Sequence, residues 1–510
     1  MKEVLHFSYG ESPFICNYSD RRENCYHLAS LEDAWEELDR YVTPEMWQNF
    51  ISSFYEVLTD LEPLFNYPID DHFEASIHAS KPEWSKVLRF GMIRTLIMRT
   101  YYKNHEEDQC QVDAIIRKLL KSIDTKERWA YISQYFTDLC EASPDAVLER
   151  LESELKTPTG MIDIFSSSNA HPLFGSNYYT NILWAIEQLL LQRKYVTRAL
   201  IWLWEMNEKE IEYKISNSPR SVLDMVFCAW YNLSVFSVEE KINNAKEAVD
   251  NYSNAWEVIA SKLPSNNSSI YGALNAPKYR ATDEVYTFRN EDVINIYNKY
   301  LKMCVNSTDT APDKWIALFA HLHYFDANCI RESLEKMVSE THKMTDASKT
   351  KIKTKLRQII HKHRYFNEAE WAMDESSIVL FANALSDIFV DNEIYDYLYL
   401  FAPDYDFPLL NPVPYSREKE NSDHRTQNEL LMEQELTEQL KVFREKNLSL
   451  ETLLILRNAL AIILSAILWL VFIVTIHLIT MSLVFFSTMT KKDSRYIITF
   501  VHSPELNRWI

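Results

Sequence analysis

The sequence predicts an all-α protein, built as an α-solenoid or an irregular helical-repeat body with one C-terminal transmembrane helix. Three observations support this fold class. Glycine is scarce, with five residues in a chain of 510, and this disfavours turn-rich β folds. Helix-start signals recur along the chain, and the residues after them have helical apolar spacing. Near the C-terminus, residues 459–486 form a run of 28 residues without Asp, Glu, Lys or Arg.

Local capping signals mark the predicted helix starts. Thr43 and Ser143 each precede a proline, so each is placed as an N-cap with proline at the first helical position. Ser237 and Glu240 have the spacing of a capping box. Within residues 145–155, apolar side chains fall at i, i+1, i+4 and i+8, which puts them on one helix face. Such helices, joined by short polar segments, would stack in pairs to form the body.

Changes in composition predict the order of the parts. Two polar stretches that contain proline are predicted to be a loop and a linker. A predicted charged helix then leads to the apolar run. The predicted parts are an N-terminal helical-repeat domain (1–260), a polar loop (261–284), a second helical domain (285–410), a linker (411–425), a charged helix (426–458), the transmembrane helix (459–486) and a short tail (487–510).

The apolar run is long enough to cross a bilayer. A helix of this length spans about 42 Å, against a hydrocarbon core of about 30 Å. The N-terminus has no apolar signal region, and the seven cysteines include no CxxC pair. We therefore expect a single pass through the cytoplasmic membrane, with the bulk of the chain in the cytosol. His477 lies inside the span as a functional candidate; the plainer alternative is an imidazole bonded to a neighbouring helix.

Composition excludes several classes of function. The glycines are too far apart for GxGxxG or GxxxxGK[ST], whose loops need glycine where the backbone approaches phosphate. A Rossmann site, a P-loop and a kinase glycine-rich loop are therefore excluded. GxSxG, HExxH and HRD-like motifs are absent, so we expect no cofactor and name no catalytic residue. The net charge of −20 disfavours a general nucleic-acid binder, because phosphate would be repelled.

Two HxH pairs were tested as metal ligands. They are His321/His323 and His361/His363, and both lie in helical context. Metal binding on a helix favours i, i+4 spacing, whereas residues two apart point about 200° apart. The sequence therefore predicts no metal site at either pair.

Residues 349–364 form a basic segment in an acidic chain. Lys349, Lys353 and Arg357 fall, with His361, in a row at i+4 steps. Arg364 follows them, and the segment contains no acid. Such a helix suits an anionic membrane surface, nucleic acid or an acidic protein. The alternative is a packed helix whose outer face pairs with acids elsewhere in the chain. Because the chain is expected to be tethered, a lipid surface is the leading functional interpretation.

Residues 395–408 alternate aromatic and acidic side chains. Tyr397 and Tyr405 are the candidate partner-binding residues, because aromatics with charged neighbours suit protein interfaces. The alternative is a helix packed by its aromatics and ended at Pro403.

Four segments together resemble a known class of helical protein. Residues 144–155, 171–208, 371–389 and 397–408 are similar, in this order, to the HEAT-like helical regions of large bacterial phage-defence proteins. The resemblance covers roughly residues 30–450. In that class the array often follows a nucleotidase or another enzymatic module, which this chain has neither the length nor the glycines to contain. No catalytic residue is carried over.

Three functional hypotheses follow. The first is a non-enzymatic, membrane-anchored helical scaffold or sensor that binds a protein partner, in antiviral defence if the resemblance holds. The second is a membrane-perturbing effector that acts through oligomerised transmembrane helices, which would require a homo-oligomer. The third is a cryptic enzyme of unknown class, for which metal-dependent activity at His321 or His361 would be the test.

Overall fold

The computed structural model describes most of the chain up to Glu445. The described residues are 15–20, 23–28, 30–103, 105–166, 177–209, 211–213, 216–265, 272–401, 407–415 and 421–445. The expected transmembrane helix (459–486), its His477, the tail (487–510) and Tyr405 lie outside these residues. Among the helices in the described ranges, none has both the length and the apolar character that a bilayer crossing requires.

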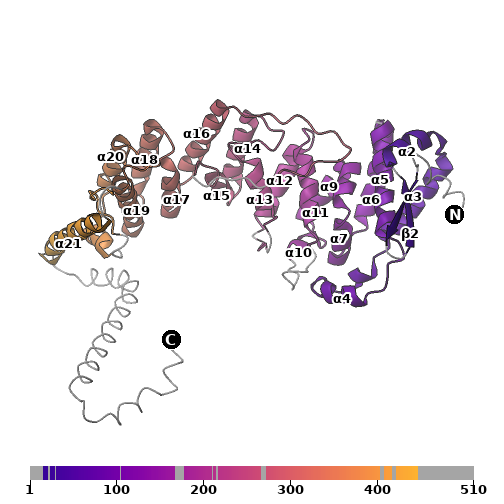
Figure 1. Cartoon of the computed structure of the whole chain (residues 1–510), viewed down its shortest axis with the longest axis horizontal. Helices are drawn as coiled ribbons and strands as arrows, with labels where there is room; N and C mark the ends of the chain where they lie inside the picture. The colour runs from indigo at the N-terminus through magenta and orange to yellow at the C-terminus, as the bar shows by residue number, and fades with distance from the viewer. Residues whose placement is uncertain are drawn as a thin grey trace, which may run out of the picture. The chain divides into compact units, whose positions relative to one another are not determined.

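The described chain is α-helical, apart from one hairpin at its N-terminal end (Figure 1). Strands β1 (Ile15–Asp20) and β2 (Glu23–Leu28) pair antiparallel, with Ile15 opposite Leu28 and Asp20 opposite Glu23. The predicted all-α class is confirmed for the body. The hairpin is not among the elements that the sequence predicts.

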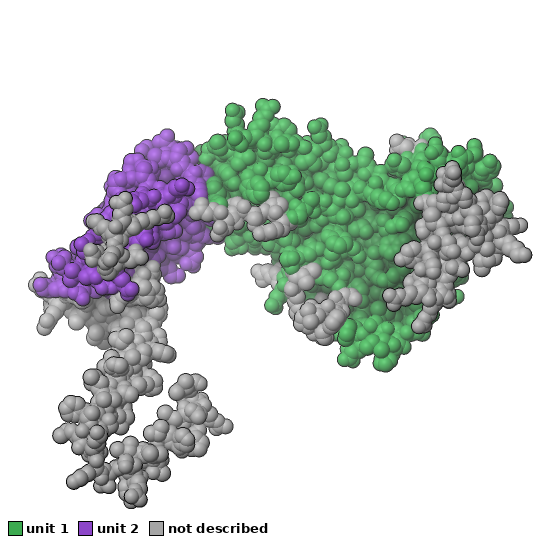
Figure 2. All heavy atoms as spheres, viewed as in Figure 1, with its two compact units in different colours: residues 1–307 green, residues 308–510 purple. Residues whose placement is uncertain are grey.

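The chain divides into two compact units, residues 1–307 and 308–510 (Figure 2). Unit 1 contains α2 (Leu31–Leu38), η1 (Asp39–Tyr41), α3 (Pro44–Thr59), η2 (Pro63–Asn66), η3 (Ile69–Asp71), α4 (His72–His78), α5 (Lys86–Lys103), α6 (Glu106–Lys121), α7 (Lys126–Ser133), α8 (Phe136–Ala142), α9 (Pro144–Lys156), α10 (Met161–Ser166), α11 (Thr180–Leu190), α12 (Val196–Asn207), α13 (Pro219–Val226), α14 (Val238–Asn251), α15 (Ala255–Ala260) and α16 (Asn290–Asn306). Helices close in the chain pack together: α5 contacts α6 and α8, α8 contacts α9 and α11, and α14 contacts α15 and α16.

The predicted caps start their helices. Thr43 accepts a hydrogen bond from the Met46 N–H, with Pro44 in the first turn of α3. Ser143 likewise caps α9, where Pro144 occupies the first turn. At α14 both halves of the predicted capping box are formed. These bonds satisfy backbone donors that a helix start leaves without intrahelical partners.

Apolar faces of these helices form the core of unit 1. Val147, Leu148 and Leu151, from the predicted stripe of α9, have no exposed surface. Trp202 of α12 packs beside them, and its indole N–H donates to the Leu151 carbonyl at 3.2 Å. The polar atom of this large side chain is thereby satisfied inside the core, which unpaired burial would make costly.

Residues 272–289, here named the strap, have no helix and pack back onto earlier helices of unit 1. The Asn275 N–H donates to Glu187 Oε2 at 2.8 Å, and the Arg280 N–H donates to Glu141 Oε1 at 2.7 Å. Burial raises the pKa of Glu187 to about 7. The interval 261–284, predicted as a polar loop between domains, therefore overlaps a segment bonded to unit 1, and the units divide after Ser307.

Unit 2 is built around one long basic helix. It contains α17 (Pro312–Leu322), α18 (Ala327–Thr341), α19 (Asp346–Tyr365), α20 (Glu375–Ser386), η4 (Glu393–Phe401) and α21 (Asn421–Glu445). Helix α19 contacts α17, α20 and η4, and α21 contacts η4. The predicted charged helix at 426–458 corresponds in its described part to α21, which already begins at Asn421.

Candidate functional site

Helix α19 positions the candidate site. Thr345 caps it by accepting a hydrogen bond from the Ser348 N–H at 3.3 Å. Ile352, Leu356 and Ile360 have no exposed surface, so this stripe fixes which face of α19 meets the core of unit 2. The basic side chains are thereby held on the flanks of the helix, where they meet neighbouring elements.

The first two residues of the predicted basic row form ion pairs within unit 2. Lys349 is buried, and its Nζ lies 3.3 Å from Asp346 Oδ1 and 3.4 Å from Asp391 Oδ2. Lys353 Nζ lies 2.6 Å from Asp396 Oδ1, at the start of the aromatic segment. The structure thus brings the basic row and the acidic, aromatic segment together.

The rest of the row also contacts its own unit. The Arg357 guanidinium lies 3.8 Å from the centre of the Tyr399 ring, a cation–π contact. Arg364 donates to the Leu410 carbonyl at 2.8 Å and pairs with Glu375. These contacts match the alternative of a packed helix paired with acids elsewhere in the chain.

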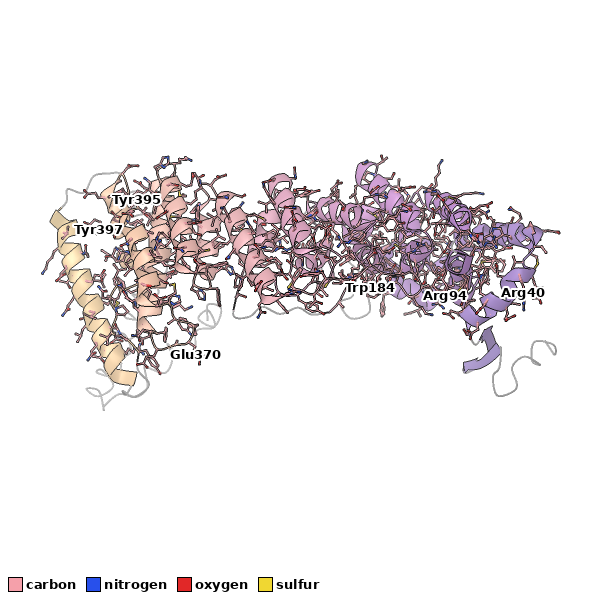
Figure 3. All side chains as sticks on the ribbon, turned by 90° about the horizontal axis from the view of Figure 1, so that it is seen from above. Arg40, Arg94, Trp184, Glu370, Tyr395 and Tyr397 are labelled. Atoms are coloured by element: carbon pink, nitrogen blue, oxygen red, sulfur yellow. The ribbon has the colours of Figure 1, made fainter. Side chains whose placement is uncertain are left out.

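The aromatic segment packs inward and holds α21. Tyr399 is buried in a cluster that Tyr397 flanks, and burial raises the Tyr399 pKa. Its hydroxyl donates to Glu435 Oε1 of α21 at 2.9 Å. Tyr395 and Tyr397, labelled in Figure 3, lie on η4 at the α21 end of unit 2.

A pocket of about 510 Å³ lies beside α17 and α19. Among the described residues that line it are Lys355, Lys362, His323, His361 and His363, and none of its described lining residues is a carboxylate. The whole chain, by contrast, has 73 acidic residues against 53 Lys and Arg. The pocket therefore differs in charge from the protein around it.

Three imidazoles from the two HxH pairs meet at this pocket. The rings of His323 and His363 lie 5.5 Å apart, centre to centre. His363 Nδ1 accepts a hydrogen bond from the Met373 N–H at 3.0 Å, which assigns the ring proton to Nε2. His361 Nδ1 lies 3.0 Å from the Leu409 carbonyl and donates to it. In the described part of the chain, no three or more His, Cys, Asp or Glu residues group as metal ligands would.

Burial keeps two of these rings neutral near pH 7. It lowers the pKa of His363 to about 4, and the nearby His323 and Lys362 act in the same direction. Burial also lowers the pKa of His323, again with help from Lys362. The positive charge of the pocket therefore comes from its lysines, because a desolvated imidazole disfavours its charged form.

The pocket lysines stand apart from the ion pairs of α19. Within the described residues, those pairs involve Lys349, Lys351, Lys353 and Arg364. Lys362 lies with its Nζ 4.8 Å from the centre of the Trp371 ring, and Lys355 is half-buried in the pocket wall. Both charges remain available to an anion.

Aromatic side chains complete the wall. Tyr365 stacks parallel to His361, with ring centres 5.8 Å apart, and Phe366 meets Tyr365 edge-on at 4.7 Å. Phe366 keeps 37% of its surface exposed. The site therefore offers cations, one neutral donor and ring surfaces together, a combination that suits an anion with a planar apolar part.

Sequence reasoning missed this convergence. Each HxH pair was considered alone. Of the predicted row of Lys349, Lys353, Arg357 and His361, only His361 lines the pocket. Two features of the sequence could have indicated the pocket. They are the HxH pair at the end of the acid-free segment and the matching pair in residues 321–323.

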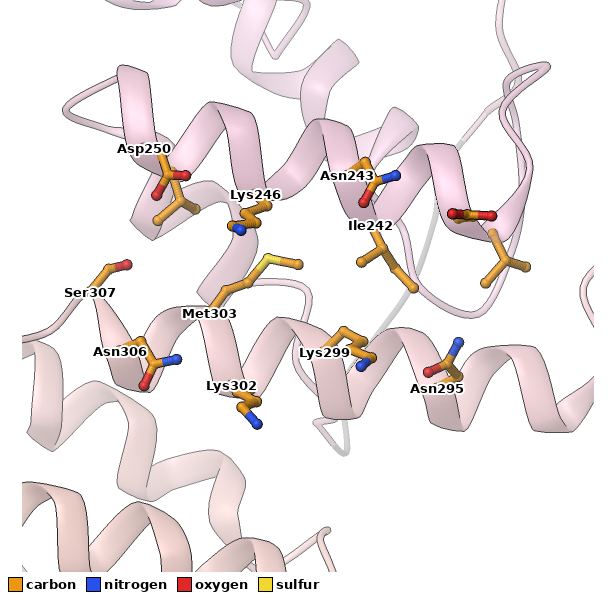
Figure 4. Close-up of a pocket in the computed structure, with 13 residues that line it drawn as sticks. Ile242, Asn243, Lys246, Asp250, Asn295, Lys299, Lys302, Met303, Asn306 and Ser307 are labelled. Carbon is orange, nitrogen blue, oxygen red and sulfur yellow. The ribbon is translucent and has the colours of Figure 1, made fainter.

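Unit 1 has a groove of its own between α14 and α16 (Figure 4). Its volume is about 670 Å³. Lys246 of α14 and Lys299 and Lys302 of α16 line it, with Ile242 and Met303 between the two helices. Acids also line it, so its charge is mixed, unlike that of the pocket.

Comparison with known proteins assigns no family. No family model matches the sequence, and no curated protein matches it. An engineered protein solved by the Northeast Structural Genomics Consortium matches 76% of this chain and 99% of its own chain, with 13% identity and a TM-score of 0.19. A likeness of that size carries no argument about this chain.

Proposed function

We propose that the protein is a membrane-anchored helical scaffold or sensor that binds a protein partner. The observation that carries the anchoring is the uncharged run of 28 residues at 459–486. In lipid, a helix satisfies its backbone hydrogen bonds internally, so such a run inserts stably. A soluble helix would need a polar face, which this run does not contain.

The connection between body and anchor supports the proposal. Helix α21 precedes the apolar run and docks on unit 2 through the Tyr399–Glu435 hydrogen bond. Leu431, Met432 and Leu436 of α21 pack against the cluster that contains Tyr399. A docked helix would transmit the position of the body to the membrane segment more directly than a flexible linker.

The helical body is suited to a scaffold. In unit 1 each layer of helices packs on layers near it in the chain, as expected of a solenoid, and such arrays present long surfaces for binding. For a protein partner we favour the groove between α14 and α16, where lysines flank an apolar floor. A role in bacterial antiviral defence is the part of the proposal that depends on the resemblance to HEAT-like regions.

Membrane extraction tests the anchor. We expect the full-length chain to remain in the membrane pellet after alkaline carbonate treatment, and a chain ending at Asn458 to move to the supernatant. A chain that loses only residues 487–510 is the matched control and should stay in the pellet. Full-length protein that is monodisperse in buffer without detergent would overturn the proposal.

The membrane-perturbing effector is kept as a second candidate because the run contains residue types that can form hydrogen bonds between helices. Ser465, Thr475 and His477 are spaced along it, and polar residues in lipid promote helix association. The same truncation at Asn458 discriminates the two: an effector loses its effect on growth, whereas a scaffold loses only its location.

A further inference from the structure

The pocket beside α17 and α19 has the charge pattern of an anion-binding site. Lys355 and Lys362 are seven residues apart on α19, so they leave the same face of the helix, separated by about 10 Å along its axis. No carboxylate is found among the described lining residues. Two cations that form no ion pair with a described residue, at this separation, suit a ligand that carries several negative oxygens.

One neutral donor borders the pocket beside Lys362. His363 is only 4% exposed and carries its proton on Nε2, because Nδ1 accepts a hydrogen bond from the Met373 N–H. The ring of His323, the residue that follows α17, lies 5.5 Å from that of His363, centre to centre, and is hydrogen-bonded to the Ala320 backbone. An imidazole held as His363 is adds a hydrogen bond to an anion without adding charge that the ligand would have to neutralise.

The remaining wall is apolar and aromatic. Phe319 and Ile359 line the pocket and are buried, and Phe366, also in its lining, is partly exposed. A volume of about 510 Å³ falls within the range of small-molecule sites, roughly 300–1,000 Å³. An inorganic anion alone would leave this apolar surface uncovered, whereas a planar ring would cover it.

We infer that this pocket binds a nucleotide, with its phosphates held by Lys355 and Lys362 and its base packed against Phe366. The inference concerns binding only and involves no bond cleavage. It goes beyond the proposed scaffold, since it supplies the small molecule that a sensor would detect. It does not depend on the membrane anchor, so either proposal can fail without the other.

Binding to the full-length chain in detergent tests the inference. Isothermal titration would use ATP, GTP and UTP as probes, with adenosine and inorganic pyrophosphate as partial ligands. We expect at least one nucleoside triphosphate to bind with a Kd below 1 mM, and both partial ligands to bind at least about tenfold more weakly, a difference of about 1.4 kcal/mol.

Substitutions measure separately how the phosphates and the base of the ligand contribute to affinity. Lys355→Gln and Lys362→Gln should each weaken the triphosphate about tenfold or more. Phe366→Ala should weaken the triphosphate and leave pyrophosphate unchanged. Lys351→Gln is the matched control: Lys351 is an exposed lysine of α19 that pairs with Asp313 outside the pocket, so affinity should stay at the wild-type value.

Several results would overturn the inference. Pyrophosphate binding as tightly as every triphosphate would reduce the pocket to a plain anion site, and an equal loss in Lys351→Gln would indicate non-specific charge attraction. Absence of binding by all three triphosphates would also overturn the inference. Photolabelling with 8-azido-ATP gives an independent measurement on unmodified protein: a label in residues 355–366 supports the inference, and a label confined to other segments contradicts it.

Discussion

At the residue scale, Lys241 shows how burial sets the state of an ionisable group. This lysine of α14 has no exposed surface, and its Nζ donates to the Cys228 carbonyl at 2.9 Å. The centre of the Phe288 ring, which belongs to the strap, lies 4.8 Å from Lys241 Nζ. Burial lowers the pKa of Lys241 to about 7, from an ordinary value of 10.5, because the ammonium loses its hydration there.

This pKa shift predicts a pH-dependent stability. Between pH 7 and 10.5 the unfolded chain holds the Lys241 proton more strongly than the folded chain does. Stability therefore rises with pH across that window, and below pH 7 the cost of the buried charge is fully present. Lys241→Met removes the titrating group and keeps the shape of the side chain. We expect this variant to be about 2–4 kcal/mol more stable than the wild type at pH 6.

The measurement is denaturant unfolding of both chains at pH 6, 7.5 and 9. The difference between them should shrink as pH rises. Lys246→Met, at an exposed lysine of the same helix, should change stability by less than about 0.5 kcal/mol. A difference that stays constant with pH would show that Lys241 is not titrating in this window.

At the element scale, α19 and η4 explain why the basic and aromatic segments are not independent surfaces. Lys353 pairs with Asp396, and the Arg357 guanidinium covers the Tyr399 ring. Tyr399 in turn bonds Glu435 of α21. Helix α21 is therefore attached to the rest of unit 2 through Tyr399, which the basic row holds in place. The position of α21 depends on the Tyr399–Glu435 contact.

Tyr399→Phe tests the attachment. It removes the hydroxyl that donates to Glu435 and keeps the ring under Arg357, so we expect a cost of about 1 kcal/mol. Hydrogen exchange of α21 amides should become faster, while exchange in α17 and α18 stays unchanged. Tyr395→Phe is the matched control on the same element. Equal protection of α21 in all three proteins would mean that the apolar contacts alone hold the helix.

At the scale of the whole molecule, the strap bonds back onto unit 1, which continues through α16 to Ser307. Residues 272–289 return to α8, where Glu141 accepts from the N–H groups of Tyr279 and Arg280. Glu141 is buried, and Arg280 also donates to its carbonyl at 3.0 Å. A polar segment thereby bonds to a helix that lies more than a hundred residues earlier in the chain.

Glu141→Ala tests the strap. It leaves two backbone N–H groups without their acceptor, so we expect unit 1 to lose about 2–4 kcal/mol. Limited proteolysis should then cut within 272–289, which the wild type protects. Glu149→Ala, at an exposed acid of α9 paired with Arg117, is the control and should leave the strap protected. Cleavage at equal rates in all three proteins would show that the strap does not depend on Glu141.

The sequence by itself determined the helical class and several helix starts. Thr43, Ser143 and Ser237 act on backbone groups within three residues, so their effect can be read without a fold. The apolar run at 459–486 is equally local, because its length and lack of charge alone make it a membrane segment by prediction. The hairpin at 15–28 was not predicted, because its strands lack a clear alternation of apolar and polar residues.

Only the tertiary structure decided which polar residues meet. The pocket joins His323 to His363, forty residues further along the chain, and the strap joins Arg280 to Glu141. Helix α19 buries Ile352, Leu356 and Ile360, and this buried face fixes the direction of its other side chains. Lys353 therefore contacts Asp396, and Arg357 contacts Tyr399. Packing of this kind depends on the combined burial of several helices, and no local spacing encodes it.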